Sequence, residues 1–383
     1  MTTDTRSVIV YVLPSLVASG GIERQFLAQM KVIDTTKFMV HVVTLCTYAG
    51  RESLYEQLPS YVTVHELSWR GGFDIKTIWS LYQLLRRLRP AVVVSSMVTA
   101  NTLVRYLRPF VGYKVIAREH NTYEDKSLRH KIRDHIGAYF SSRIVAVSKT
   151  VADFSSRQSL IPRSWFTVIY NGIDTKRVED FLATDAEAKV AALRAEFGWR
   201  PETKIILNVA RLKKHKNHRL LIDGFALYCK AYPTADVVLC IVSAGSEEAN
   251  LRAYVSALGL EDRVILTGYR NDVYTFFATA KVFFLTSDIE GFPNVAIEAF
   301  AFGVPVASTL VSGIDEIVVD GQQGRLIERT PESVCATIEW FFGLSDDAWE
   351  DVSTHAKATA AQFDITRIVK EYEDLFQELI ARK

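Results

Sequence analysis

Short apolar runs alternate with amphipathic stretches along most of the chain, and this alternation restricts the fold more than any other feature. Residues 8–13 form a β-branched run, 22–33 have helical spacing, and 39–45 form a second run. A strand, a helix and a strand in this order predict a βαβ unit and hence a parallel sheet. Further strands are predicted at 91–95, 114–117, 144–147 and 166–170, with a helix over 126–140.

A second alternation follows a turn and a linker. Asn171-Gly172 is a strong turn signal, and residues 176–197 have the composition of a connecting helix. Strands are then predicted at 205–209, 237–242, 264–267, 282–285 and 304–307, and a final helix at 365–383. The expected fold is therefore α/β, with an N-terminal Rossmann-like domain (1–172), a C-terminal Rossmann-like domain (173–362) and a helix (363–383) that packs back on the N-terminal domain.

Charge is divided unevenly between the two halves, although the total is only +1. Residues 1–170 contain 22 Lys and Arg against 12 Asp and Glu, while the remainder contains 23 against 32. A basic half can rest on an anionic membrane surface, and an ordinary solvated surface is the alternative. Because no aromatic-interleaved basic motif of the RNA-binding kind is present, we expect no nucleic-acid partner.

The cysteines and the hydrophobic runs favour a cytoplasmic protein. The four cysteines are scattered without CxxC pairs or histidines at ligand spacing, so neither a zinc site nor a disulfide framework is predicted. The apolar stretch 8–18 is preceded by Asp4, interrupted by Pro14 and β-branched at its start, which indicates a buried strand rather than a signal peptide. No apolar run reaches the roughly 18 residues that span a bilayer.

The most specific polar pattern is SDIEGFPNVAIE, residues 287–298, which follows a predicted strand. Pro293 suits the first turn of a helix, which places Glu290 in the loop and Glu298 in the second turn. Gly291 permits close backbone approach, and the free amides at a helix start favour an anion. The two carboxylates could accept hydrogen bonds from sugar or ribose hydroxyls; acidic residues favoured by the helix dipole alone are the alternative.

A second strand-end loop is strongly basic and reads RLKKHKN, starting at Arg211. Cations beside a helix start gain nothing from the dipole, which favours anions there, so a negative ligand should neutralise them. A diphosphate bound by Arg211 and Lys216 is our prediction, with Lys213 and Lys214 solvated. A plain basic surface loop is the alternative.

Two further strand ends carry weaker signals. Ser19-Gly20-Gly21 could approach a phosphate, but it lacks the GxGxxG spacing of a dinucleotide site. His120 could hydrogen-bond a sugar hydroxyl or move a proton, and a structural role is the alternative.

Together these residues resemble the large retaining glycosyltransferase family 4, whose GT-B fold has two Rossmann-like domains facing across a cleft. The resemblance covers nearly the whole chain and rests on Gly20-Gly21 with Glu23, His120, the turn 171–174, the loop 211–216, Gly268-Tyr269, Glu290, Glu298, and residues 303–306 and 321–324. Two loops depart from the family pattern: residues 242–246 are less glycine-rich, and Ser312 stands where a second glycine is frequent.

The resemblance implies a role for each of these residues. In the family, the residues matching Arg211 and Lys216 neutralise the donor diphosphate, and the one matching Glu298 holds the ribose. Glu290 would face the donor sugar, and His120 would act on the sugar side. The other implied donor-binding residues are Gly20, Gly21, Gly245, Tyr269, Arg270, Gly291, Phe292, Pro293 and Asn294.

The resemblance also implies a reaction: transfer of a hexose or N-acetylhexosamine from a nucleoside diphosphate sugar, most often UDP-linked, in cell-surface polysaccharide or lipopolysaccharide biosynthesis. Front-face attack, in which the departing phosphate oxygen takes the acceptor's proton, would retain the anomeric configuration. No DxD-type pair stands on a loop, so we expect no metal and no other cofactor.

The acceptor implied is a glycan or a polyprenyl-linked glycan. Residues 84–89 and 126–133 mix cations with apolar residues as interfacial helices do, which predicts peripheral binding to the inner face of the cytoplasmic membrane. A nucleotide-sugar 2-epimerase of the same architecture and a non-catalytic sugar- or nucleotide-binding protein are the alternatives. A nicotinamide dehydrogenase is disfavoured because no strand precedes a complete dinucleotide fingerprint.

Overall fold

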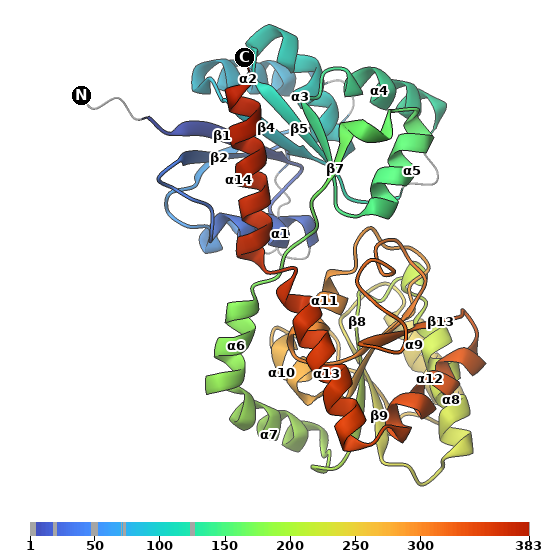
Figure 1. The fold of residues 1–383 in the computed structure, drawn as a ribbon. Helices are drawn as coiled ribbons and strands as arrows, with labels where there is room; N and C mark the ends of the chain where they lie inside the picture. Colours follow the sequence, from blue (N-terminus) through green and yellow to red (C-terminus); the bar gives the residue numbers. More distant parts are fainter. Residues whose placement is uncertain are drawn as a thin grey trace. The chain divides into compact units, whose positions relative to one another are not determined.

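The computed structural model describes residues 5–17, 21–46, 53–69, 71, 74–122 and 127–382. The chain divides into two compact units, the first formed by Met1–Ile173 with Asp364–Lys383 and the second by Asp174–Phe363. Each unit is built on a parallel sheet with helices packed on it (Figure 1). The predicted α/β class with two parallel sheets is therefore confirmed.

The first unit contains a sheet of seven strands among the described residues, in the order β3-β2-β1-β4-β5-β6-β7. Its strands are β1 (Ser7–Leu13), β2 (Phe38–Thr44), β3 (Thr63–Glu66), β4 (Val92–Ser96), β5 (Lys114–Glu119), β6 (Arg143–Ala146) and β7 (Phe166–Val168). Its helices are α1 (Gly21–Met30), α2 (Ile75–Leu88), α3 (Val98–Val111), α4 (Leu128–Ala138) and α5 (Lys149–Ser159). The central strands are buried on both faces, which explains why they are continuous apolar runs rather than alternating ones.

The helix α14 (Ile365–Ala381) follows the second unit in sequence but belongs to the first unit. Its apolar side chains, among them Ile368, Tyr372 and Phe376, join the core formed by β1, β2 and β4, and Figure 1 shows the helix lying across that sheet. A Cβ atom at Gly172 would lie 2.9 Å from the Cα of Ile365, so only glycine permits this close passage of the two chain segments.

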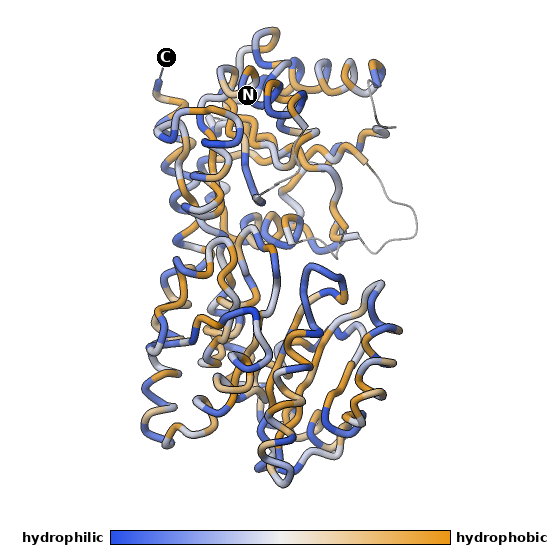
Figure 2. The backbone as a smooth tube through the Cα atoms, turned by 90° about the vertical axis from the view of Figure 1, so that its right-hand side faces the viewer, coloured by the Kyte–Doolittle hydropathy of each residue, from blue (hydrophilic) through white to orange (hydrophobic). Residues whose placement is uncertain are grey.

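The second unit contains a sheet of six strands among the described residues, in the order β10-β9-β8-β11-β12-β13. Its strands are β8 (Lys204–Val209), β9 (Val237–Val242), β10 (Val264–Leu266), β11 (Val282–Leu285), β12 (Val306–Thr309) and β13 (Gly324–Ile327). Its helices are α6 (Thr175–Thr184), α7 (Ala186–Phe197), α8 (His218–Ala231), α9 (Glu248–Ala257), α10 (Val273–Thr279), α11 (Asn294–Ala301), α12 (Pro331–Gly343) and α13 (Asp346–Ala361). Figure 2 shows apolar residues concentrated along the strands.

Three local predictions differ from the structure. The single linker helix is two helices, α6 and α7, which meet at Asp185. The helix predicted to begin at Pro293 begins at Asn294, because Pro293 occupies the N-cap position. The edge strands β3 and β13 were not predicted. Among the described residues, no helix combines the length and the apolar character needed to cross a membrane.

Candidate active site

The candidate site lies where the strand order of the second sheet reverses, between β8 and β11. These strands pair directly, with Phe283 opposite Leu207, and the Asn208 side-chain amide donates to the Phe284 carbonyl at 2.8 Å. In open parallel sheets, ligands bind beyond the carboxyl ends of the strands at such a reversal. The loops after β8 and β11 are the basic loop and the Glu290 loop predicted from the sequence.

The two loops meet through an ion pair between Lys216 and Glu290. The Lys216 Nζ lies 2.5 Å from the Glu290 Oε1, and the two side chains are only 15% and 14% exposed. The Ser287 hydroxyl donates to the same carboxylate oxygen at 2.7 Å, so the carboxylate is held from two sides. The Thr286 hydroxyl donates to the Asn217 carbonyl at 3.1 Å, which joins the backbones of the loops.

Positive charge gathers around the basic loop. Burial, followed by the neighbouring Lys216 cation, lowers the pKa of His215, and Lys213 and Arg211 contribute in the same direction. Arg211 is exposed and has no carboxylate partner among the described residues. A cationic loop with one exposed arginine and one lysine fixed by a carboxylate can bind a diphosphate without first moving the lysine.

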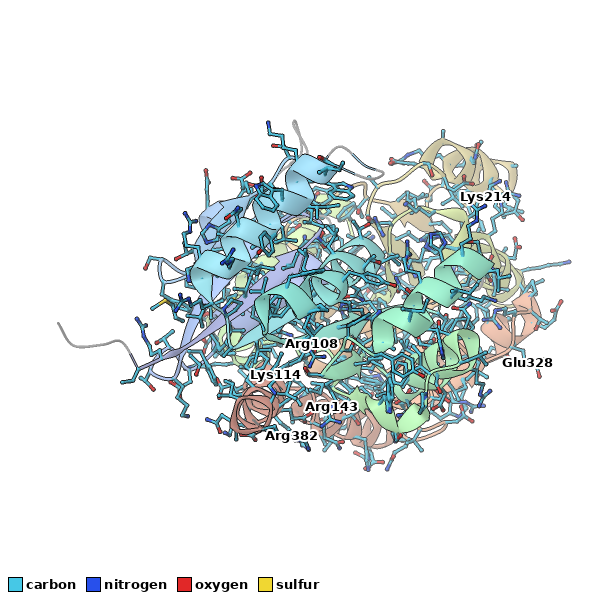
Figure 3. All side chains as sticks on the ribbon, turned by 90° about the horizontal axis from the view of Figure 1, so that it is seen from above. Arg108, Lys114, Arg143, Lys214, Glu328 and Arg382 are labelled. Atoms are coloured by element: carbon cyan, nitrogen blue, oxygen red, sulfur yellow. The ribbon has the colours of Figure 1, made fainter. Side chains whose placement is uncertain are left out.

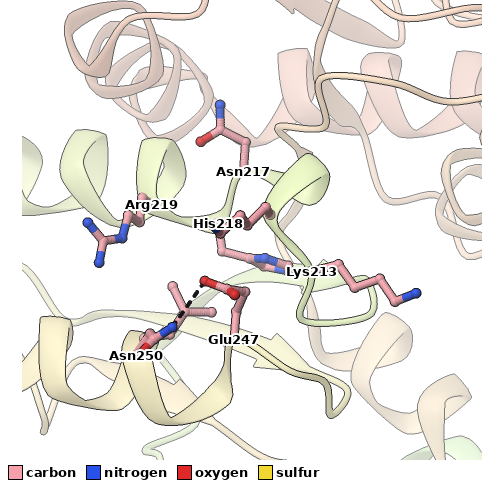
Figure 4. A pocket seen from close by; sticks show the side chains of 8 residues that line it. Lys213, Asn217, His218, Arg219, Glu247 and Asn250 are labelled. Atoms are coloured by element: carbon pink, nitrogen blue, oxygen red, sulfur yellow. Dashed lines mark hydrogen bonds between the residues drawn. The ribbon is translucent and has the colours of Figure 1, made fainter. Parts of the chain in front are cut away.

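Lys213 and Lys214 line a cavity whose lining residues do not include Lys216. The cavity has a volume of about 510 Å³ and lies at the starts of α8 and α9, where His218, Arg219 and Glu247 also line it. Figure 4 shows Lys213 extending away from the cavity's far wall, where the Asn250 amide donates to Glu247. Both lysines are exposed, as predicted.

Gly245 lies in the loop after β9, which packs against the backbone of the basic loop. A Cβ atom at this position would lie 2.3 Å from the Leu212 carbonyl oxygen, and the Leu212 amide donates to the Ala244 carbonyl at 3.2 Å. The loop after β9 therefore packs backbone against backbone on the loop that carries Arg211 and Lys216. This contact requires glycine at position 245 even though the surrounding loop has fewer glycines than the family pattern.

The helix α11 begins beside the ion pair and carries Glu298 in its second turn. Gly291 and Phe292 are buried, Asn294 and Glu298 are half-buried, and the Ser312 hydroxyl donates to the Gly291 carbonyl at 3.0 Å. The unexpected Ser312 thus holds the turn that precedes the helix. The structure places Glu290, Gly291, Phe292, Pro293, Asn294 and Glu298 on one continuous segment.

Tyr269 and Arg270 follow β10, and their side chains have different environments. Tyr269 is more than half exposed. Arg270 pairs with Glu196 at 2.6 Å and with Asp272 at 2.8 Å, and these hydrogen bonds raise the pKa of the guanidinium. The Arg270 side chain is therefore engaged within the unit, so a role in seating a nucleotide base would fall to the backbone here.

The remaining predicted site residues belong to the first unit. His120, at the end of β5, is buried, and burial lowers its pKa well below the ordinary value, with the Arg118 cation acting in the same direction. Its Nε2 atom has no hydrogen-bond partner among the described residues. Gly21 begins α1, and the neighbouring Glu23 accepts from the Ser15 hydroxyl at 3.2 Å. Gly20 lies outside the described residues.

Ser287 is a site residue that the sequence pattern did not single out. Its position three residues before Glu290, directly beyond a buried strand, is the signal that could have indicated it, because a hydroxyl there can reach a carboxylate in the same turn.

Two family models match the chain. Residues 19–177 match Glycosyltransferase Family 4, and residues 190–357 match Glycosyl transferases group 1. The matches cover both units and include the loops that carry Lys216 and Glu290. The chain belongs to glycosyltransferase family 4.

Curated relatives with different named activities match part of the chain. The chain is 27% identical over 257 residues to the N-acetyl-alpha-D-glucosaminyl L-malate synthase of Bacillus anthracis, a match that covers 67% of the chain and 64% of the relative. It is 31% identical over 210 residues to an N-acetylgalactosamine-N,N'-diacetylbacillosaminyl-diphospho-undecaprenol 4-alpha-N-acetylgalactosaminyltransferase of Campylobacter jejuni, covering 53% and 51%. The matched part is thus less than two thirds of either relative's length.

Solved structures of glycosyltransferases share the GT-B fold of this family 4 chain. A glycosyltransferase from Rickettsia africae superimposes with a TM-score of 0.86 at 17% identity, covering 99% of this chain and 100% of that one. Alr3699/HepE of Anabaena, solved in complex with UDP and glucose, gives a TM-score of 0.80 at 19% identity, covering 97% and 99%. At these identities the likeness shows the fold alone.

Proposed function

We propose that the protein transfers a hexosyl or N-acetylhexosaminyl group from a nucleoside diphosphate sugar to a glycan or lipid-linked glycan. The proposed donor is a UDP-sugar. The acceptor would serve cell-surface polysaccharide biosynthesis, and the anomeric configuration would be retained. The observation that carries the proposal is the Lys216–Glu290 pair at the reversal of the second sheet. The Campylobacter relative, named for a diphospho-undecaprenol substrate, and the Anabaena structure with UDP and glucose support the acceptor and the donor.

In the proposed reaction, the acceptor hydroxyl oxygen forms a bond to the anomeric carbon while the bond from that carbon to the β-phosphate oxygen breaks. The departing phosphate oxygen takes the acceptor's proton, and the nucleoside diphosphate leaves. Negative charge grows on the diphosphate during this step, so fixed cations accelerate it most when they need no rearrangement. A lysine ammonium has three hydrogens, so Lys216 can keep its bond to Glu290 and still donate to phosphate oxygens.

The same cations would make a divalent metal unnecessary. Arg211 and Lys216 supply positive charge beside the diphosphate, and the start of α11 at Asn294 adds the positive end of the helix dipole. We therefore propose metal-independent transfer, with Glu298 holding the ribose and His120 acting on the sugar side. Because burial keeps His120 neutral, it would accept or donate one hydrogen bond rather than carry charge.

The acceptor half of the proposal includes peripheral binding to the inner face of the cytoplasmic membrane. The surplus of cations in residues 1–170 supports it, because cations near an anionic bilayer each favour binding by about 1 kcal/mol.

The test is transfer itself. The full chain is incubated with UDP-, GDP- or ADP-sugars and polyprenyl-diphosphate-linked sugars, and the product and its anomeric configuration are read by mass spectrometry and NMR. We expect an elongated acceptor with the donor's configuration, and undiminished yield in the presence of EDTA. Inversion at C2 of the donor without acceptor would instead indicate an epimerase, and tight UDP-sugar binding without any turnover would indicate a binding protein.

A further inference from the structure

The helix α4 has its polarity reversed relative to an ordinary surface helix. Its buried residues are Asp134, Gly137 and Ala138. The large apolar side chains at its start, middle and end point outward, with exposed fractions of 72% for Leu128, 51% for Ile132, 46% for Ile136 and 62% for the adjoining Tyr139. Residues four apart lie on one face of a helix, so these side chains form a single apolar stripe.

The inner face of α4 explains why the stripe cannot turn inward. It packs against α3, where the buried Arg105 lies 3.9 Å from Glu119 and is also attracted by Asp134. A Cβ atom at Gly137 would lie 3.2 Å from the Arg105 side chain, so the helix approaches this arginine closely. Rotating the stripe inward would remove Asp134 from a buried cation, which is strongly unfavourable.

The apolar stripe continues beyond α4. The rings of Tyr139 and Trp165 pack edge to face, with their centroids 5.1 Å apart. The His135 Nδ1 lies 3.1 Å from the Leu160 carbonyl oxygen, which brings the end of α5 beside α4. Leu160, the most exposed of the large apolar residues described, is 78% exposed. Leu128, Ile132, Ile136, Tyr139 and Leu160 therefore form one patch, here called the α4 patch.

The charge around the α4 patch is cationic. Residues 127–165 contain seven Lys and Arg against two Asp and Glu. Of the two acids, Asp134 is buried, and Asp153 pairs with Arg163. Arg129 and Lys131, which flank the stripe, are therefore not offset by an exposed carboxylate on α4.

The helix α2 of the first unit also exposes apolar side chains near cations, with Ile75 68% and Trp79 59% exposed and Lys76 and Arg86 exposed on the same helix. Within the predicted interfacial segment 84–89, Leu84 and Leu85 are buried in the core and Leu88 is half-buried, so of this segment it is the arginines that are exposed. Arg143 and Arg382, on the side of the unit seen in Figure 3, share the carboxylate of Glu378.

We propose that the α4 patch docks on an anionic phospholipid bilayer, with its apolar side chains among the headgroups and Arg129 and Lys131 against lipid phosphates. Exposed apolar surface flanked by cations is the combination that binds such an interface. The inference rests on the proposed function in one respect: a docked α4 patch would bring the protein to the membrane that holds the proposed lipid-linked acceptor.

The experiment is co-sedimentation of the full chain with phosphatidylcholine vesicles, with and without phosphatidylglycerol. We expect binding to the anionic vesicles, weakened about tenfold or more by Ile132→Ser because insertion of apolar groups drives it. The double change Arg129→Gln with Lys131→Gln should weaken binding about fivefold per cation, on anionic vesicles only. Phe110→Ser, which removes an exposed aromatic residue from α3 in the same unit, is the matched control and should bind as the parent does.

UDP binding and the melting temperature, measured on every variant, separate failure of docking from failure of folding or of the donor site. Equal binding of the parent and Ile132→Ser to anionic vesicles would overturn the inference while leaving transfer activity intact. The inference would also be overturned if the parent protein did not bind vesicles but formed a dimer that Ile132→Ser dissociates. The α4 patch would then bind a second copy of the chain. Absence of UDP binding with normal docking would instead count against the proposed function.

Discussion

The Lys216 ammonium nitrogen and the Glu290 carboxylate oxygen lie 2.5 Å apart, although 74 residues separate them in the sequence. Removing either side chain leaves the charge of the other, which is only about 15% exposed, without its partner. The glutamate thus positions the lysine, in addition to any contact it makes with the donor sugar.

Replacing Lys216 with Ala should lower kcat about 100- to 1000-fold, since a preorganised donor to the developing charge is lost. Lys213→Ala, an exposed lysine of the same loop, is the control and should keep near-normal turnover. Steady-state kinetics with matched melting temperatures would decide, and similar rates for the two variants would refute the diphosphate role of Lys216.

A double-mutant cycle should show that Glu290 acts largely through Lys216. If so, the loss of kcat in Glu290→Gln combined with Lys216→Ala should be close to that of Lys216→Ala alone, because coupled residues are not additive. Fully additive losses would mean that Glu290 has a separate function, such as forming a covalent intermediate.

Replacing Glu298 with Ala should weaken UDP binding about 10- to 100-fold, the effect of losing a hydrogen bond to a charged group. Isothermal titration calorimetry measures this directly. Glu328→Ala, which removes an exposed carboxylate from the same unit, serves as the reference. Unchanged UDP affinity in Glu298→Ala would disprove the ribose assignment.

Gly245→Ala should impair the enzyme through the backbone of the basic loop, although it leaves Arg211 and Lys216 themselves unchanged. The new methyl group would lie 2.3 Å from the Leu212 carbonyl, so the backbone that carries Arg211 must shift. A displacement near 1 Å can cost about 100-fold in turnover. In Gly343→Ala the added methyl meets no atom within 4 Å, and that variant should behave as the parent does; equal activities would show that the loop tolerates the shift.

The stability of the protein should fall in acid partly because of His218. Burial lowers its pKa to about 4, so as pH falls below about 6.5 the unfolded state takes up a proton before the folded state does. The contribution of neutral His218 to the free energy of unfolding is therefore fully present above pH 6.5. It falls by about 3 kcal/mol as the pH approaches 4. Denaturant unfolding of His218→Gln should show a smaller loss over this range, whereas exposed His130→Gln should not differ from the parent.

The sequence predicted all the central strands, because a strand covered on both faces is an uninterrupted apolar run, and it also predicted the edge strands β7 and β10. The two that it missed, β3 and β13, are sheet edges, where TVHE and GRLI are partly exposed and their patterns are correspondingly weak. These two strands depend on pairing with their neighbours, β2 and β12, which the local sequence does not encode.

The candidate site shows a similar division. Each loop could be recognised because it follows a buried strand and carries an unusual concentration of charge or glycine. The contact between Lys216 and Glu290 depends on β8 pairing with β11, two strands that are not consecutive in the chain. The Ser287 and Ser312 hydrogen bonds depend on side-chain directions within turns, which spacing alone does not reveal.

The helix α14 has a consequence for biosynthesis. The first unit takes its last core helix from residues that the ribosome adds after the entire second unit. The second unit, which is contiguous, can complete its core during translation, while β1, β2 and β4 wait for Tyr372 and Phe376. The half that is made first is therefore the half that finishes folding last, and nascent chains stalled before residue 365 should keep its sheet open to proteases or chaperones.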